Sequence, residues 1–473
     1  MTEGSQKPPA PEAANGDGAL QRIFRALRHR NYKLFFAGQL VSLIGTFLTM
    51  NATNWLVLRL THSSVKLGIV GFASQIPSFA LAPFAGVWVD RLNRRRLIVT
   101  TQTLAMLQSF ALAALALPHL ITFPEIVALS LFQGMINSFD MPARQAFLVE
   151  MVTDRADLAN AIALNSIMVH FARLLGPAIA GFLIWWVGEG LCFTIDGISY
   201  IGVIAALLAM RIAPRPRRPT RSMTTEMKEG FHYVWHFLPI RVLLLTMAAI
   251  SLTGMPALSV LMPIYAAHFV GGAMSGAGVE LAVNSGAGAQ IFGVLGAASG
   301  LGALTAAYFL ARRKTVVGLG RLIAIAAYVF SAALIAFSQS RALWLSLLLV
   351  PVAGWGAISL FASCNTLLQT LADEDKRGRV MAFFGMAFVG MTPFGSLIAG
   401  ELASRLTPHG AEPIVGASRT LLLEAGICIL TATAYLKMLP VIRRVIRPIY
   451  IKKGILPAIA DGLAASAQVA REE

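Results

Sequence analysis

Charged residues are scarce in this chain. Only 13% of its 473 residues are Asp, Glu, Lys or Arg, whereas about a quarter of the residues of a soluble domain are charged. Hydrophobic residues make up 56% of the sequence. This composition excludes an ordinary soluble protein and predicts a chain that crosses a membrane several times.

Cysteine is also scarce, with three residues in the whole chain. Cys192, Cys364 and Cys428 each fall in an apolar segment, and their spacing fits neither a disulfide framework nor a zinc site. We therefore expect no metal and no cofactor. Residues 1–21 lack the apolar core of a signal peptide and are expected to form a disordered cytoplasmic tail.

Long apolar runs dominate the rest of the chain and predict an all-α membrane protein with about twelve spans. An N-terminal tail and basic lead-in at 1–33 precede a first six-helix bundle at 34–210. A linker at 211–237 joins it to a second bundle at 238–440, and a basic tail occupies 441–473. The expected spans are 34–58, 67–89, 97–117, 124–151, 159–186, 191–210, 238–270, 287–311, 317–337, 343–371, 380–405 and 420–439.

The net charge of +16 reflects topology rather than a nucleic-acid surface, because the basic residues lie between apolar runs. Segments such as 94–96, 211–221, 312–314, 376–379 and 443–453 fall on one side of the membrane if the N-terminus is inside. Lys and Arg favour the cytoplasmic side. Both termini are therefore expected in the cytoplasm, with the basic loops against anionic lipid.

A charged segment, GVWVDRLNRRR at 86–96, is predicted to form a loop between the second and third spans. Gly86, Asp90, Arg91, Arg94 and Arg95 match the pattern GxxxDRxxRR. This pattern resembles the loop between helices two and three of major facilitator superfamily transporters. The resemblance implies two bundles related by a repeat, and a latch in which Asp90 docks near residues 377–379 when the molecule opens outward.

A second pattern, ARLLGPAIAG at 172–181, lies in the fifth span. Its Gly176, Pro177 and Gly181 are similar to the GxxxGPxxGG motif of superfamily exporters, with Ala replacing Gly at 172 and 180. The phrases at 30–45, 139–147, 160–165 and 377–381 resemble the branch that contains enterobactin-type siderophore exporters and related secretion or efflux proteins. One departure is Ser130, which stands where many proton-coupled exporters carry Arg.

Polar residues inside the spans form the candidate substrate pathway. Gln133, Asn137, Asp140 and Arg144 share one face of the fourth span, and superfamily resemblance places that helix on the central cavity. Asn51, Asn54 and Arg173 complete the expected set. A structural alternative stays open, in which Pro142 breaks the helix, Asp140 caps the resumed helix and Arg144 neutralises Asp140.

The function expected from the resemblance is export of an amphipathic small molecule, such as a drug, siderophore or metabolite, across the bacterial inner membrane. The expected mechanism is alternating access with proton antiport, by a monomer, with Asp140 as the titrating group. An importer of the same fold is the first alternative, and a membrane enzyme or lipid scramblase is the second. The arginines suit an anionic substrate, whereas Asp140 and the Met and aromatic residues suit a lipophilic cation.

Overall fold

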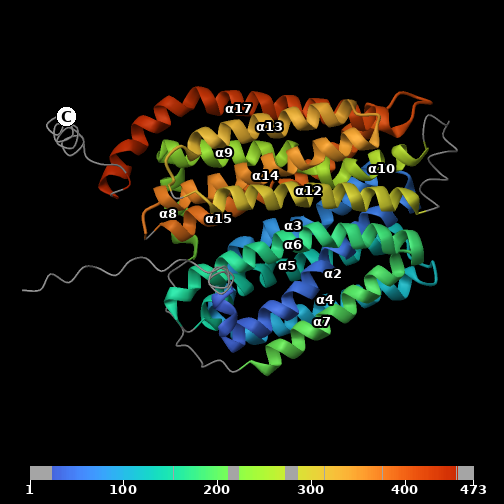
Figure 1. Ribbon diagram of the computed structural model, residues 1–473, viewed down its shortest axis with the longest axis horizontal. Coiled ribbons are helices and arrows are strands. Elements are labelled where there is room, and N and C mark those ends of the chain that lie inside the picture. The colour runs from blue at the N-terminus through green and yellow to red at the C-terminus, as the bar shows by residue number, and fades with distance from the viewer. Residues whose placement is uncertain are drawn as a thin grey trace, which may run out of the picture.

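The computed structural model is helical throughout the residues that it describes, which are 24–152, 154–210, 223–271, 286–313, 315–374, 376–453 and 455. Figure 1 shows the helices running side by side along the long axis of the molecule. The first half of the chain forms a short 3₁₀ turn, η1 (Arg25–Arg28), and then α2 (Arg30–Thr61), α3 (Ser64–Arg91), α4 (Arg94–Ala116), α5 (Phe123–Met151), α6 (Arg155–Val187) and α7 (Glu189–Ala209).

A linker helix, α8 (Met223–His236), precedes the second half. That half contains α9 (Leu238–Thr253), η2 (Ala257–Leu261), α10 (Met262–Gly271), α12 (Ala287–Ala311), α13 (Leu319–Gln339), α14 (Leu343–Leu371), α15 (Arg377–Phe388), α16 (Thr392–Arg405) and α17 (Pro413–Lys452). The predicted N-terminal tail, the linker start at 211–222 and the tail beyond 455 lie outside the described residues.

The predicted all-α membrane fold is confirmed. By length and composition, 11 helices among the described residues can cross a membrane. The fourth predicted span corresponds to α5, a helix of 29 residues, which carries Glu125, Asp140, Arg144 and Glu150 and is therefore less apolar. Each of these charges lowers the mean hydropathy of α5, and α5 is therefore not among the 11 helices.

The helices form two groups, which lie above and below one another in Figure 1. We call residues 24–210 the N-half and residues 238–453 the C-half. The turns at 62–63, 117–122, 188, 340–342 and 406–412 mark one end of the molecule, the Ser63 end. The last residues of α3, α5, α12 and α14 mark the opposite end, which we call the Asn93 end after the turn residue that follows α3.

One predicted boundary was wrong, whereas the predicted spans 238–270 and 380–405 agree with the apolar stretches Leu238–Val270 and Arg377–Arg405, although each contains an irregular turn. The expected loop at 86–96 is mostly helical, because α3 continues to Arg91 and α4 starts at Arg94, where the Asn93 side chain accepts the Arg96 amide at 3.1 Å. The span at 238–270 is divided by the π-helical turn η2 between Pro256 and Pro263. The span at 380–405 is interrupted between Phe388 and Thr392. Proline removes a helical hydrogen bond and explains the break at η2.

Candidate functional site

The exporter-like motif of α6 packs against a glycine-rich face of α12, so that the two halves touch through their backbones. A Cβ atom on Gly293 would overlap the Pro177 carbonyl and lie 2.7 Å from the Gly181 Cα. A Cβ on Gly181 would lie 2.8 Å from the Ala289 carbonyl oxygen. Glycine is thus required here by the close approach of two helices. On the other side of α6, a Cβ on Gly176 would collide with Phe47 of α2.

A second contact between the halves joins α3 to α16 near the Ser63 end. The Ser64 hydroxyl donates a hydrogen bond to the Gly400 carbonyl at 3.0 Å. A Cβ on Gly68 would lie only 2.5 Å from the Ser396 carbonyl oxygen. Further along α3, Phe79 meets Phe394 edge to face, with ring centroids 5.5 Å apart. The two helices therefore stay in contact from the Ser63 end to about the middle of α3.

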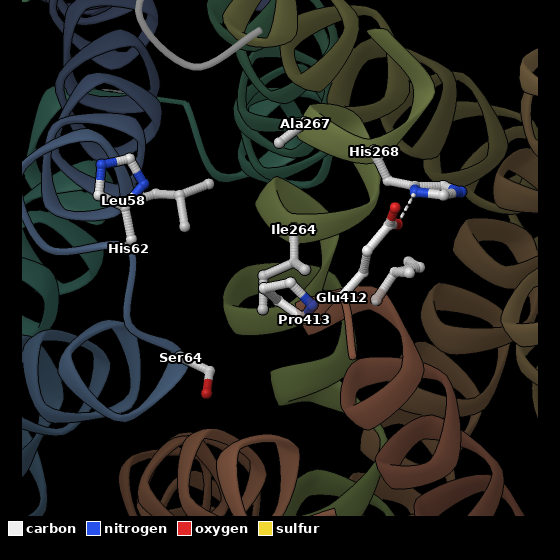
Figure 2. Close-up of a pocket in the computed structure, with 9 residues that line it drawn as sticks. Leu58, His62, Ser64, Ile264, Ala267, His268, Glu412 and Pro413 are labelled. Atoms are coloured by element: carbon white, nitrogen blue, oxygen red, sulfur yellow. Dashed lines mark hydrogen bonds and ion pairs between the residues drawn. The ribbon is translucent and has the colours of Figure 1, made fainter. Parts of the chain in front are cut away.

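A small pocket opens beside this contact at the Ser63 end, and Figure 2 shows that both halves line it. His62 and Ser64 come from the N-half, whereas His268 and Glu412 come from the C-half. The His268 ring nitrogen Nδ1 lies 3.0 Å from a Glu412 carboxylate oxygen. The sequence did not single out this pair, since the two residues are far apart along the chain.

At the Asn93 end, the ion pairs that the structure describes do not join the N-half to the C-half. Arg94 pairs with Glu150 of α5 at 2.6 Å, and Arg95 donates hydrogen bonds to the Leu207 and Leu208 carbonyls at 2.7 and 2.6 Å. Arg379 of the C-half pairs with Glu229 of the linker helix at 2.6 Å.

The latch remains a prediction. Arg94 and Arg95 fasten the start of α4 to its own half. The surroundings of Gly86 and the side chains of Asp90 and Arg91 lie outside the described residues.

The stripe on α5 contains a buried ionic network. Asp140 accepts hydrogen bonds from Thr101 at 2.7 Å and from Gln102 at 2.9 Å, both on α4. Its second oxygen pairs with Arg144. Because α5 is one continuous helix through Pro142, Asp140 does not cap a resumed helix. Of the structural alternative, the structure contains only the pairing of Asp140 with Arg144.

The other predicted pathway residues make weaker or local contacts. Gln133 donates to Asn137 at 3.2 Å along α5, and Asn51 donates to the Phe47 carbonyl of its own helix at 2.8 Å. Asn54 reaches the Ser259 carbonyl of η2 at 3.4 Å and thus bridges the halves. The guanidinium of Arg173 lies over the Phe47 ring, 5.7 Å from its centroid.

Two further buried acids were noticed in the sequence without partners. Asp196 of α7 accepts hydrogen bonds from Thr49 of α2 and Ser109 of α4, each at 2.8 Å. Glu424 of α17 is only 2% exposed, and both carboxylate oxygens are buried without a hydrogen-bond partner among the described residues. The hydroxyl partners of Asp196 come from two other helices and form no recognisable pattern in the sequence, so residue spacing did not reveal them.

Comparison with known proteins supports the predicted transporter family along nearly the whole chain. The sequence profile of a family described as transmembrane secretion effectors matches residues 22–443. The chain is 24% identical over 373 residues to a staphyloferrin A transporter of Staphylococcus aureus, a match that covers 77% of this chain and 88% of the relative. It is 28% identical to the multidrug efflux pump Tap of Mycolicibacterium fortuitum, covering 77% and 87% of the two chains.

The fold also resembles a solved transporter structure. A crystal structure of the nucleoside transporter NupG superposes with a TM-score of 0.67 and 15% identity, covering 87% of this chain and 99% of that one. Such a likeness supports the architecture alone.

Proposed function

The chain belongs to the transmembrane secretion effector family of the major facilitator superfamily, and from this premise we propose that it exports an amphipathic small molecule. Membership makes the chain a multi-pass membrane transporter of a small molecule rather than an enzyme. The observation that carries the export proposal is the family match over 22–443, together with the similarity to an efflux pump. The resemblance of Gly176, Pro177 and Gly181 to an exporter motif also supports the export proposal, and these residues pack against α2 and α12.

Transport would proceed by alternating access, in which the two halves rock about a central site. We take the bundles to be 34–210 and 238–440, joined by the linker. The Asn93 end carries most of the basic residues and is assigned to the cytoplasm, with both termini there. The contacts at Ser64, Gly68 and Gly293 support closure on the outer side, so that this form would admit substrate from inside the cell.

Export would be coupled to protons entering the cell, and Asp140 is the residue that the sequence favours as the titrating group. Its carboxylate is paired with Arg144, so a proton arriving there would compete with that guanidinium. The pathway would include Asn51, Asn54, Gln133, Asn137 and Arg173. We place the protein in the bacterial inner membrane as a monomer, because one chain contains both bundles.

Inside-out membrane vesicles test this proposal. A pH-sensitive dye reports the proton gradient while drugs and siderophores are added one at a time, with Asp140→Asn vesicles as the comparison. Loss of the gradient on adding one compound, absent with Asp140→Asn, supports proton-coupled export. If a labelled compound accumulates without proton movement, the result supports export and contradicts proton coupling. If no compound in a broad panel moves protons or accumulates, the result favours an importer.

A further inference from the structure

Arg173 carries a fixed positive charge at the middle of a membrane span. The apolar part of α6 runs from Asn160 to Val187, and Arg173 lies at its midpoint. The side chain is half-buried, and its Nε atom is buried without a hydrogen-bond partner among the described residues. Arginine does not lose its proton in proteins, so the charge must be balanced by an anion or by water.

Among the described residues, the neighbours of Arg173 do not supply that anion. The Phe47 ring under the guanidinium is neutral, and a cation over a ring is stabilised without being neutralised. One turn earlier on α6, the buried Nδ1 atom of His170 also lacks a partner among the described residues, and a histidine adds no negative charge.

The buried acids of the N-half are already bound elsewhere. Asp140 pairs with Arg144. Asp196 is held by hydroxyl groups of α2 and α4. Asp157 pairs with Arg25 and His29, and Glu189 pairs with Arg59. The remaining buried acid that the structure describes, Glu424, belongs to α17 of the other half. An anion that reaches Arg173 would therefore come from outside the described protein.

The position of Arg173 is also one that must move during transport. A Cβ atom on Gly300 of α12 would lie 2.9 Å from the Arg173 carbonyl oxygen and 2.7 Å from the Leu174 Cα. Phe47 belongs to α2 of the N-half. Arg173 thus lies where α2 and α6 of one half meet α12 of the other, and a ligand bound there would contact the moving interface.

From this geometry we infer that Arg173 binds the anionic group of the transported molecule, so that the substrate is an amphipathic anion with a carboxylate or similar group. This inference rests on the proposed transport function and narrows its substrate class. The planar guanidinium can hold a carboxylate through two parallel hydrogen bonds. The adjacent Phe47 ring offers an apolar surface to the rest of the molecule.

Binding to the purified full-length protein tests this inference without depending on transport. Two fluorescent dyes of similar size serve as probes, an amphipathic carboxylate and an amphipathic quaternary ammonium, and their anisotropy is followed as protein is added. We expect the wild-type protein to prefer the carboxylate dye and Arg173→Gln to weaken its binding about tenfold or more. Arg173→Lys should fall between them, because lysine keeps the charge without the planar fork.

Arg405→Gln is the matched control, because Arg405 is an exposed arginine paired with Glu401 at 2.7 Å, and it should bind the carboxylate dye as the wild type does. The inference is overturned if the wild-type protein binds the carboxylate dye no more tightly than the ammonium dye. It is also overturned if Arg173→Gln binds the carboxylate dye normally. If Arg173→Gln does not fold, normal binding by Arg173→Lys overturns the two-hydrogen-bond geometry, and the comparison of dyes on wild-type protein still decides the charge.

Failure of export gives a different result from failure of the anion site. If the carboxylate dye binds in a way that requires Arg173 but does not accumulate in inside-out vesicles, the result supports the anion site and contradicts export. Accumulation of the carboxylate dye at the same rate with Arg173→Gln as with the wild type would support export and contradict the anion site.

Discussion

Single buried charges in the N-half are held in two different ways. Asp140 has a full set of partners, including Arg144, whereas Asp196 relies on the hydroxyl groups of Thr49 and Ser109. The sequence offered the first arrangement as an alternative, because Asp140 and Arg144 are four residues apart and therefore neighbours on one helix face. It could not predict the second, which depends on the rotation of three helices that are distant along the chain.

Arg144→Gln is expected to destabilise the protein strongly. The substitution leaves the Asp140 carboxylate, 2% exposed, buried with neutral donors alone, and removing one partner of a buried ion pair costs about 3 kcal/mol or more. Thermal unfolding of the purified protein should show a midpoint several degrees lower. Arg405→Gln, which removes an exposed pair, should change stability by about 1 kcal/mol or less. An equal effect of both substitutions would contradict the importance of the Asp140 network.

The contact between η1 and the start of α6 should weaken at acidic pH. The hydrogen bond from His29 at 2.9 Å and the ion pair with Arg25 hold the pKa of the Asp157 carboxyl below its ordinary value. A lowered pKa stabilises the folded state above the ordinary Asp value of about 4, and this contribution is lost as the pH falls through the lowered value.

Hydrogen exchange at the Ala26 amide, which donates to Asn160 at 2.9 Å, measures this release. Protection should decrease below about pH 4 in the wild type, beyond the normal pH dependence of exchange. In Asp157→Asn it should be weaker at neutral pH and show no such further decrease. Identical profiles for the two proteins would exclude Asp157 as the acid-sensitive contact.

At the scale of helices, the contact between α6 and α12 depends on the absence of side chains. Gly293→Ala would place a methyl group against backbone atoms of Pro177 and Gly181, so the helices must separate. Overpacking of this kind costs about 1–3 kcal/mol, and we expect transport in vesicles to fall with it.

Gly426→Ala on α17 is the matched substitution, because nothing lies within 4 Å of the added Cβ. It should leave transport unchanged and stability equal or slightly higher. Normal transport by Gly293→Ala would show that close approach of α6 and α12 is not needed.

The turn between α3 and α4 belongs to the same scale. The proposed latch would bring Asp90 to residues 377–379 when the outer side opens, and Arg379 would then have to leave Glu229. Asp90→Asn should therefore slow transport several-fold while the amount of protein in the membrane stays the same. Asp373→Asn, at an exposed carboxylate of the same end, should transport normally. Wild-type transport by Asp90→Asn would remove the latch.

For the molecule as a whole, the sequence predicted the number and order of helices well, because each span must bury a long apolar run. The predicted loop at 86–96 was wrong because two residues, Leu92 and Asn93, are enough for the turn. The contacts between halves could not be predicted, since glycines such as Gly68 and Gly293 meet partners in the opposite half. That pairing is fixed only when both bundles are assembled.

Export out of the cell is the central claim, and sidedness tests it most directly. Inside-out and right-side-out vesicles are prepared from the same cells with equal amounts of protein, and uptake of one labelled compound is compared under an imposed proton gradient. We predict accumulation in the inside-out vesicles that greatly exceeds that of vesicles lacking the protein, and none in the right-side-out vesicles. Accumulation in the right-side-out vesicles alone would contradict export and identify an importer.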